Sequence, residues 1–321
     1  MRMSFFAGLA VCSLAVVSTP ALATEAETLA EAITDGKVEL NFRYRAESVE
    51  QTGFALDAFS STLRTKLKYT SGVFKGFSGV LEFDNVTNIG ANAFNSTVNG
   101  RTRFPVIADP QITEVNQAYL AYTGIDDTKL MAGRVALNMN NQRFFGTVGW
   151  RQNDQTWDML GFINSSIPDL TLTGAYVWNV NRIFGNDHPL GDLDTNTVLI
   201  DAKYSGLGFG NLTSYALLID LNDAPVLGRS SQTYGIRFDG KHKMADGGFT
   251  VLYEAEYATQ SDYSSNPTNF NVDYFHIAGG LSAAGFTAKL GFETLGTDNG
   301  NFAFQTPFAT LHKFNGWADI F

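Results

Sequence analysis

The stretch Val38-Glu-Leu-Asn-Phe-Arg-Tyr-Arg-Ala-Glu47 reads VELNFRYRAE and alternates strictly between apolar and polar side chains. Apolar residues hold the even positions from Val38 to Ala46, and polar, mostly charged residues hold the odd positions from Glu39 to Glu47. A period of two is that of a β-strand with one apolar and one polar face. In a soluble sandwich the apolar face is the core. In a membrane barrel the apolar face meets lipid and the charged face lines the lumen.

The composition favours the membrane barrel. Charged residues make up 17% of the chain and aromatic residues 13%, whereas a soluble protein carries roughly 25% charged residues. No segment beyond the N-terminal region approaches the ~20 apolar residues of a transmembrane helix. The formal net charge of −10 makes nucleic acid a poor partner.

The N-terminus has the features of a secretory signal peptide. Arg2 provides a positive start, residues 5–17 are apolar, and Ala21-Leu-Ala23 is a small-x-small cleavage motif. We therefore expect residues 1–23 to be removed after Ala23. The apolar run is short for a membrane anchor of ~20 residues, and the stretch before Cys12 is too brief for a lipoprotein signal. Cleavage would remove Cys12, the only cysteine, and with it disulfide or thiol chemistry.

Period-two segments follow an Ala/Glu-rich lead, residues 24–36, which could form a short periplasmic helix. Each segment is close to the ~9–11 residues that a tilted membrane strand requires. The thirteen predicted strands are residues 37–49, 59–69, 77–84, 114–122, 129–137, 156–164, 170–178, 197–204, 212–221, 230–239, 249–260, 272–281 and 286–295.

The connections alternate between short turns and generally longer loops, which is typical of bacterial outer-membrane barrels with turns on the periplasmic side. We therefore predict an all-β fold, an antiparallel transmembrane β-barrel over residues 37–321. Thirteen is an odd number, whereas single-chain bacterial barrels have an even number of strands. We expect a barrel that is incomplete at its C-terminus, with 16–18 strands when complete. A miscounted pair of strands, or a tail that completes the last strand, is the alternative.

Charged side chains on the inward faces suggest a polar lumen. The first two predicted strands carry a basic ladder of Arg43, Arg45, Arg64, Lys66 and Lys68. Glu254, Glu256 and Glu293 lie on strands far along the chain. In a closed barrel these two groups would form opposite walls, and the field between them would filter polar solutes. Alternatively, the lumen charges pair with one another and only keep the pore wet.

Two long connections carry residues that could meet a solute. Residues 85–113 contain Arg101 and Arg103 and could either fold into the lumen as a constriction or remain an exposed surface loop.

Within residues 140–155, Arg143 and Arg151 could pair with carboxylates or sugar hydroxyls, and Trp150 could stack on a sugar ring. The same residues could instead pack this loop over the mouth of the barrel.

Three segments, NNQRFFGTVGWRQNDQTWD, TEVNQAYLAYTG and LRTKLKYTSGVFKGFSGVLEFDNV, resemble a family of Gram-negative outer-membrane porins grouped with alginate-export proteins. The resemblance runs from about Lys37 to the end, and members are usually longer, with further strands after a segment like HKFNGWADIF. It implies a porin-like channel. The family's namesake exports an anionic polysaccharide through an arginine-lined pore, which the basic ladder would suit.

Enzyme motifs are missing from the sequence. The four histidines fall in no HExxH pair, and there is no Gly-x-Ser-x-Gly elbow. We expect no enzyme, no cofactor and no metal, but a passive channel for small polar or anionic solutes in the Gram-negative outer membrane. Its partners would be membrane lipids, lipopolysaccharide and those solutes, in an oligomeric state that the sequence does not set. The alternatives are an exporter of an anionic polysaccharide such as alginate, and a plugged structural or adhesive barrel with binding loops.

Overall fold

The computed structural model describes residues 9–17, 25–244 and 247–316. Fourteen strands form a single antiparallel sheet in which the order in space is the order in sequence. All thirteen predicted strands are present. They are β2 (Lys37–Val49), β3 (Ala58–Thr70), β4 (Phe77–Ala93), β5 (Ile112–Ile125), β6 (Thr128–Val135), β7 (Thr156–Ile167), β8 (Leu170–Asn181), β9 (Asp192–Tyr204), β10 (Asn211–Ile219), β11 (Ser231–Lys243), β12 (Thr250–Asp262), β13 (Asn271–Ala283) and β14 (Phe286–Leu295).

The additional strand, β1 (Leu9–Val17), lies within the expected signal peptide. It pairs with β2 from Leu9↔Glu47 to Val17↔Glu39, so removal of the peptide would leave β2 as an edge strand. The expected cleavage position, Ala23, and the C-terminal Phe321 lie outside the described residues.

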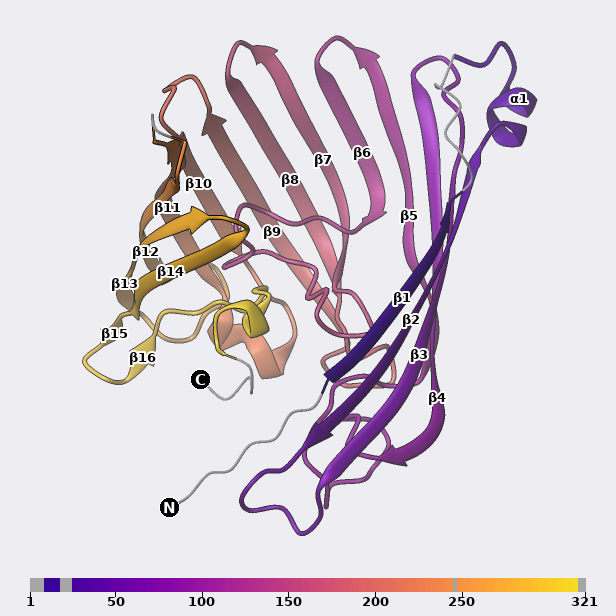
Figure 1. The fold of residues 1–321 in the computed structure, drawn as a ribbon, viewed down its shortest axis with the longest axis vertical. Helices are drawn as coiled ribbons and strands as arrows, with labels where there is room; N and C mark the ends of the chain where they lie inside the picture. The colour runs from indigo at the N-terminus through magenta and orange to yellow at the C-terminus, as the bar shows by residue number, and fades with distance from the viewer. Residues whose placement is uncertain (1–8, 18–24, 245–246, 317–321) are drawn as a thin grey trace.

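The sheet curls strongly around its own interior (Figure 1). β1 and β14 are its two edges, and within the described ranges they do not pair with each other. The barrel is therefore not closed in this part of the chain. No helix among the described residues is long and apolar enough to cross a membrane.

Short turns gather at one end of the sheet and longer loops at the other, as the alternation in the sequence predicts (Figure 1). The β13–β14 turn is only two residues, Ala284 with φ 50° and Gly285 with φ 82°. Positive φ at both positions is what a tight hairpin turn requires. At the same end lies the expected short helix, α1 (Leu29–Thr34). Its Ile33 carbonyl accepts a 2.5 Å hydrogen bond from the Tyr69 hydroxyl, which ties the N-terminal lead to the sheet.

The outward face carries a band of exposed apolar side chains on most strands from β2 to β14. This is the surface that a lipid-facing barrel presents. Its members include Val38, Leu67, Leu81, Leu120, Leu160, Ile200, Ile236, Ile277 and Leu290.

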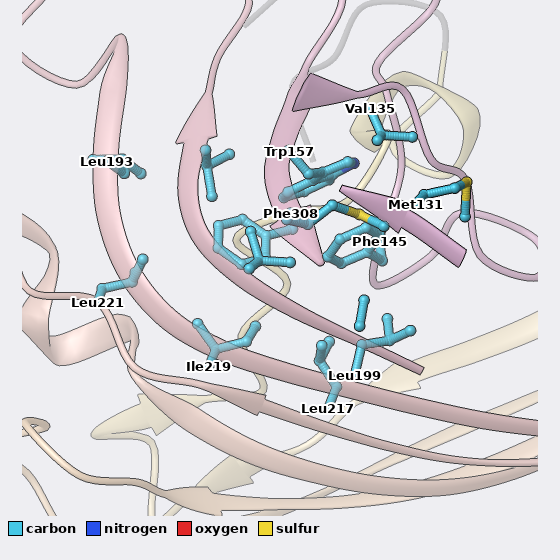
Figure 2. Packing of buried hydrophobic residues seen from close by; sticks show 14 of the residues in the cluster. Met131, Val135, Phe145, Trp157, Leu193, Leu199, Leu217, Ile219, Leu221 and Phe308 are labelled. Atoms are coloured by element: carbon cyan, nitrogen blue, oxygen red, sulfur yellow. The ribbon is translucent and has the colours of Figure 1, made fainter. Parts of the chain in front are cut away.

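Part of the inward face is apolar as well, which departs from the expected polar lumen. Inward side chains of β6 to β10 form the largest buried cluster, and Phe145 and Phe308 from two loops pack onto it (Figure 2). Phe145 stacks on Trp157 with 3.7 Å between ring centroids, and Phe308 meets Trp157 edge-on at 5.1 Å. This inner cluster gives the two loops an apolar surface on which to fold inside the sheet.

A β-bulge changes the phase of β5. The register between β4 and β5 shifts between Glu82 and Phe83, so that Asn116 is the extra residue. A bulge adds one residue to one strand and changes which side chains share a face. Asn116 consequently turns inward and donates a 2.6 Å hydrogen bond to Glu82.

Candidate functional site: a loop-constricted lumen

The connection between β6 and β7, residues 136–155, crosses the interior of the curled sheet (Figure 1). It meets residues 304–315 there, since Gly146 N donates to Phe308 O at 2.9 Å and Thr310 N to Gln142 O at 3.1 Å. We call residues 136–155 the constriction loop. Its side chains contact the inward faces of β2, β3 and β14.

The basic ladder lies on the inward face at β2 and β3. Arg43 and Arg64 are directly opposite each other in the strand register. The guanidinium of Arg43 donates to Gln152 Oε1 at 2.8 Å, to Gly149 O at 3.0 Å and to Arg151 O. All three acceptors are neutral atoms of the constriction loop, and no ion pair of Arg43 is formed within the described ranges. Like charges directly opposite destabilise a sheet, and Asp154, 4.0 Å from Arg64, offsets part of this repulsion.

The other ladder residues meet acids that the sequence analysis did not single out. Buried Arg45 pairs with Glu47 at 2.7 Å and with Asp109 at 3.4 Å. Lys66 pairs with Glu82 at 3.6 Å, with Asp84 at 3.5 Å and with Asp154. Lys68 lies on the same face, closer to the turn end. Arg45, Arg64 and Lys66 are thus paired with acids, whereas Arg43 and Lys68 form no ion pair within the described ranges.

Asp154 connects the constriction loop to the ladder. Burial alone would raise its pKa, but the charges of Lys66 and Arg64 and hydrogen bonds from Lys66 and Asn116 outweigh burial, so the pKa of Asp154 is lowered. A carboxylate so placed stays ionised at neutral pH. It holds the loop against the basic wall.

Trp150 fills the space beside the ladder. Its ring stacks on His312 with 3.6 Å between centroids and an interplanar angle of 9°. The guanidinium carbon of Arg45 lies 4.5 Å from the Trp150 ring, and Arg151 pairs with Glu47 at 3.1 Å. Trp150 and Arg151 therefore face the ladder wall, and the indole ring joins the constriction loop to residues 304–315.

The predicted acidic residues lie on the inward face of the opposite wall, but each has a basic partner. Arg237 donates to Glu254 Oε2 at 2.5 Å and to Glu256 Oε2 at 2.9 Å. Arg143, from the constriction loop, donates to both carboxylate oxygens of Glu293 at 2.8 and 3.2 Å. These contacts therefore do not form the expected positive wall and negative wall. Both walls consist of ion-paired networks.

The loop over residues 85–113 is shorter than expected, because β4 continues to Ala93 and β5 begins at Ile112. Arg101 and Arg103 are exposed, and Arg101 binds the Asn92 carbonyl, so neither joins the constriction. The same loop nevertheless delivers the fully buried Asp109 to the ladder. Asp109 follows the apolar Ile107 and Ala108, a signal that this part of the loop is inside.

Solved structures of outer-membrane porins share this architecture. OccAB3 of Acinetobacter baumannii has a TM-score of 0.64 at 15% identity, over 82% of this chain and 68% of that one. OccK9 (OpdG) of Pseudomonas aeruginosa has 0.65 at 14%, over 82% and 68%. OpdK of P. aeruginosa, solved with vanillate, has 0.61 at 14%, over 84% and 75%. At such identities the likeness shows the fold, which is that of Occ and Opd porins. No family model and no curated protein matches the chain.

Proposed function

We propose that this chain forms an outer-membrane channel through which small polar or anionic solutes diffuse passively. The observation that carries the proposal is the directly opposed pair Arg43 and Arg64 at the constriction. Arg43 donates only to neutral atoms, so its charge is available to a passing anion. A charge that forms no ion pair of its own is typical of a functional site.

The similar folds support the same function. OpdK, described as an outer membrane protein, has been solved with vanillate, a small organic anion. By analogy we place the chain in the Gram-negative outer membrane, with residues 1–23 as its signal peptide, residues 24–36 as a periplasmic lead and the barrel from residue 37. The short turns and α1 would face the periplasm. The analogy rests on the fold alone.

Export of an anionic polysaccharide such as alginate has less support. A polymer needs a lumen through which a chain can thread, whereas the constriction loop lies across this one and contacts both Arg43 and Glu293. The same loop favours a plugged barrel as the second candidate, because Phe145 and Phe308 form an apolar core inside the sheet. We infer no enzymatic role from the charged networks.

The first experiment is single-channel conductance in a planar bilayer with a KCl gradient. A channel should conduct steadily, and the variant R43Q/R64Q should move the reversal potential away from chloride preference. The variant R101Q/R103Q is the matched control, because it removes two positive charges from an exposed loop. Folded protein that does not conduct would leave the plugged barrel as the function. Equal reversal potentials in the two variants would exclude the ladder as the selective surface.

A further inference from the structure

The outward face of β3 to β6 holds a groove of about 420 Å³. Its lining combines large and small side chains, which are Tyr69, Leu81, Leu120, Gly79, Ala118 and Ala132. In the strand register Gly79 and Ala132 flank Leu120, and Tyr69 and Ala118 flank Leu81. Leu81 and Leu120 belong to the exposed apolar band, so their small neighbours leave a hollow in the surface that faces lipid. The groove lies outside the lumen.

The groove lies near the turn end of the sheet. Gly79 is the third residue of β4, and Tyr69 is the last but one of β3. The helix α1 lies beside these strand ends, on the outside of the curled sheet (Figure 1). It is fixed there by the 2.5 Å hydrogen bond from Tyr69 to Ile33 and by a 2.7 Å hydrogen bond from Gly72 N to Ala32 O. The same tyrosine thus lines the groove and holds the N-terminal lead.

The residues around this end of the groove are typical of a membrane–water interface. The exposed Phe77 ring lies 4.5 Å from the Tyr122 ring, measured between centroids, and aromatic side chains at strand ends form the interfacial girdle of a barrel. Leu29 and Ile33, four positions apart on one side of α1, are both exposed. An apolar helix face beside a membrane is typical of a helix that lies among lipid head groups. The groove therefore lies just inside the hydrocarbon layer, where lipid covers it.

The charges beside the groove indicate the kind of lipid. Lys75, in the β3–β4 turn, is exposed and forms no ion pair within the described ranges; its ammonium lies 5.3 Å from the ring of the neighbouring Phe74. The lead contacts this turn through a 2.8 Å hydrogen bond from Ala26 N to Val73 O. It carries the exposed acids Glu25, Glu27, Glu31 and Asp35. One base beside several acids repels a purely anionic head group, whereas a head group with a phosphate and an ammonium can meet both signs.

We propose that this groove binds one acyl chain of a phospholipid with a phosphoethanolamine head group, whose phosphate lies at Lys75 and whose ammonium lies at the acids of residues 25–36. Such a lipid would join the N-terminal lead to the outer wall of the sheet. Its place in the periplasmic leaflet rests on the proposed outer-membrane function, which assigns the turns to that side. The binding itself does not require conductance.

The test is native mass spectrometry of the folded protein from detergent micelles, titrated with palmitoyl-oleoyl phosphatidylethanolamine and with the phosphatidylglycerol of the same chains. The ethanolamine lipid should bind as one molecule per chain, and more tightly than the glycerol lipid. Lys75→Gln should weaken its binding about two- to fivefold, as expected for the loss of an exposed charge pair.

Gly79→Leu should weaken binding about fourfold or more, because the new side chain displaces at least one methylene group from the groove. A Cβ at Gly79 meets nothing nearer than Leu120 Cδ2 at 3.8 Å, so the strand accepts the change. Gly279→Leu is the matched control. Gly279 is exposed on the outward face of β13, away from the groove, and a Cβ there meets only Leu252 O at 3.9 Å.

A wild type without a bound lipid, or equal binding by Gly79→Leu and Gly279→Leu, would overturn the site. Tighter binding of the glycerol lipid would overturn the assigned head group, and a protein dimer in place of the lipid adduct would assign the groove to a second copy. Failure of the site differs from failure of the channel. A conducting protein without a bound lipid refutes the site alone, and lipid binding by a non-conducting protein refutes the channel alone.

Discussion

Arg143 and Glu293 are 150 positions apart in the chain, yet Arg143 Nε lies 2.8 Å from Glu293 Oε1 and Nη2 lies 3.2 Å from Oε2. This two-point ion pair joins the middle of the constriction loop to the last strand of the main sheet. On the other side, the same loop reaches Arg43 on β2 through Gln152. The loop therefore spans the lumen between two walls and is anchored at both.

The first prediction concerns this anchor. Glu293→Gln leaves the guanidinium of Arg143, which is 1% exposed, without its carboxylate. Breaking a buried pair costs about 3–5 kcal/mol, so we expect lower resistance to urea and a larger, noisier conductance as the loop detaches. The double variant R143Q/E293Q should recover part of the stability, because no unpaired charge remains. Additive losses in the double variant would show that the two residues do not act as a pair.

The second prediction concerns the opposite anchor. Because the pKa of Asp154 is lowered in the folded protein, its contribution to stability is present above the ordinary aspartate value and is lost as the pH falls through the folded pKa. Asp154→Asn mimics the protonated state at neutral pH, removes the ion pair of Arg64 and leaves Lys66 with two of its three acidic partners. We expect the reversal potential in a KCl gradient to move toward chloride.

The pH dependence of the difference in reversal potential between the wild type and D154N tests whether the pKa of Asp154 is lowered. The wild type and D154N should differ from pH 7 to pH 5 and should become alike only in acid below the ordinary aspartate range. Asp126→Asn, in an exposed turn, is the control and should leave selectivity unchanged. Convergence of the wild type and D154N near neutral pH would contradict a lowered pKa.

The positions of the strands could be predicted from the sequence because the alternation is a local property. The predicted strand that became β4 ends at Asp84, whereas β4 continues to Ala93. This difference concerns only the end of the strand and not its existence. The lumen could not be predicted in the same way, because it depends on which loop meets which wall. Asp109 and Asp154 lie in loops, and nothing in their local sequence assigns them to Arg45 and Lys66.

One signal in the sequence did carry information about the constriction. The segments that became β9 and β10 are apolar on both faces, as in Val198-Leu-Ile200 and Leu217-Leu-Ile219. A strand that faces lipid on one side and water on the other should alternate. Apolar residues on both faces therefore indicate that the inward face is covered. The covering segment contains the adjacent apolar residues Phe144 and Phe145, and its Leu137 and Met139 pack against the same cluster.

The third prediction concerns Trp150, which is stacked on His312 and contacted by Arg45. Trp150→Ala removes a ring stack and a cation–π contact, together worth about 1–3 kcal/mol of local stability. The open form of the constriction loop should then be populated about 5–150-fold more. Limited digestion with trypsin should cleave after Arg143 or Arg151 correspondingly faster. Trp178→Ala on the exposed outer face is the control. Equal cleavage rates in the two variants would show that the Trp150–His312 stack does not hold the constriction loop in place.

The last prediction concerns a charged pair on the outward face. Arg134 Nε and Nη2 donate to the two oxygens of Asp158 at 2.7 and 3.0 Å, and the strand register places both beside the exposed Leu160 and Leu120. An unpaired arginine facing lipid costs up to about 2–4 kcal/mol at mid-membrane and less near the interface. Asp158→Asn should therefore destabilise the folded protein in vesicles by about 1–4 kcal/mol. R134L/D158N should be more stable than D158N alone, because the second change removes the exposed cation. If D158N unfolds at the same urea concentration as the wild type, water rather than lipid solvates this pair.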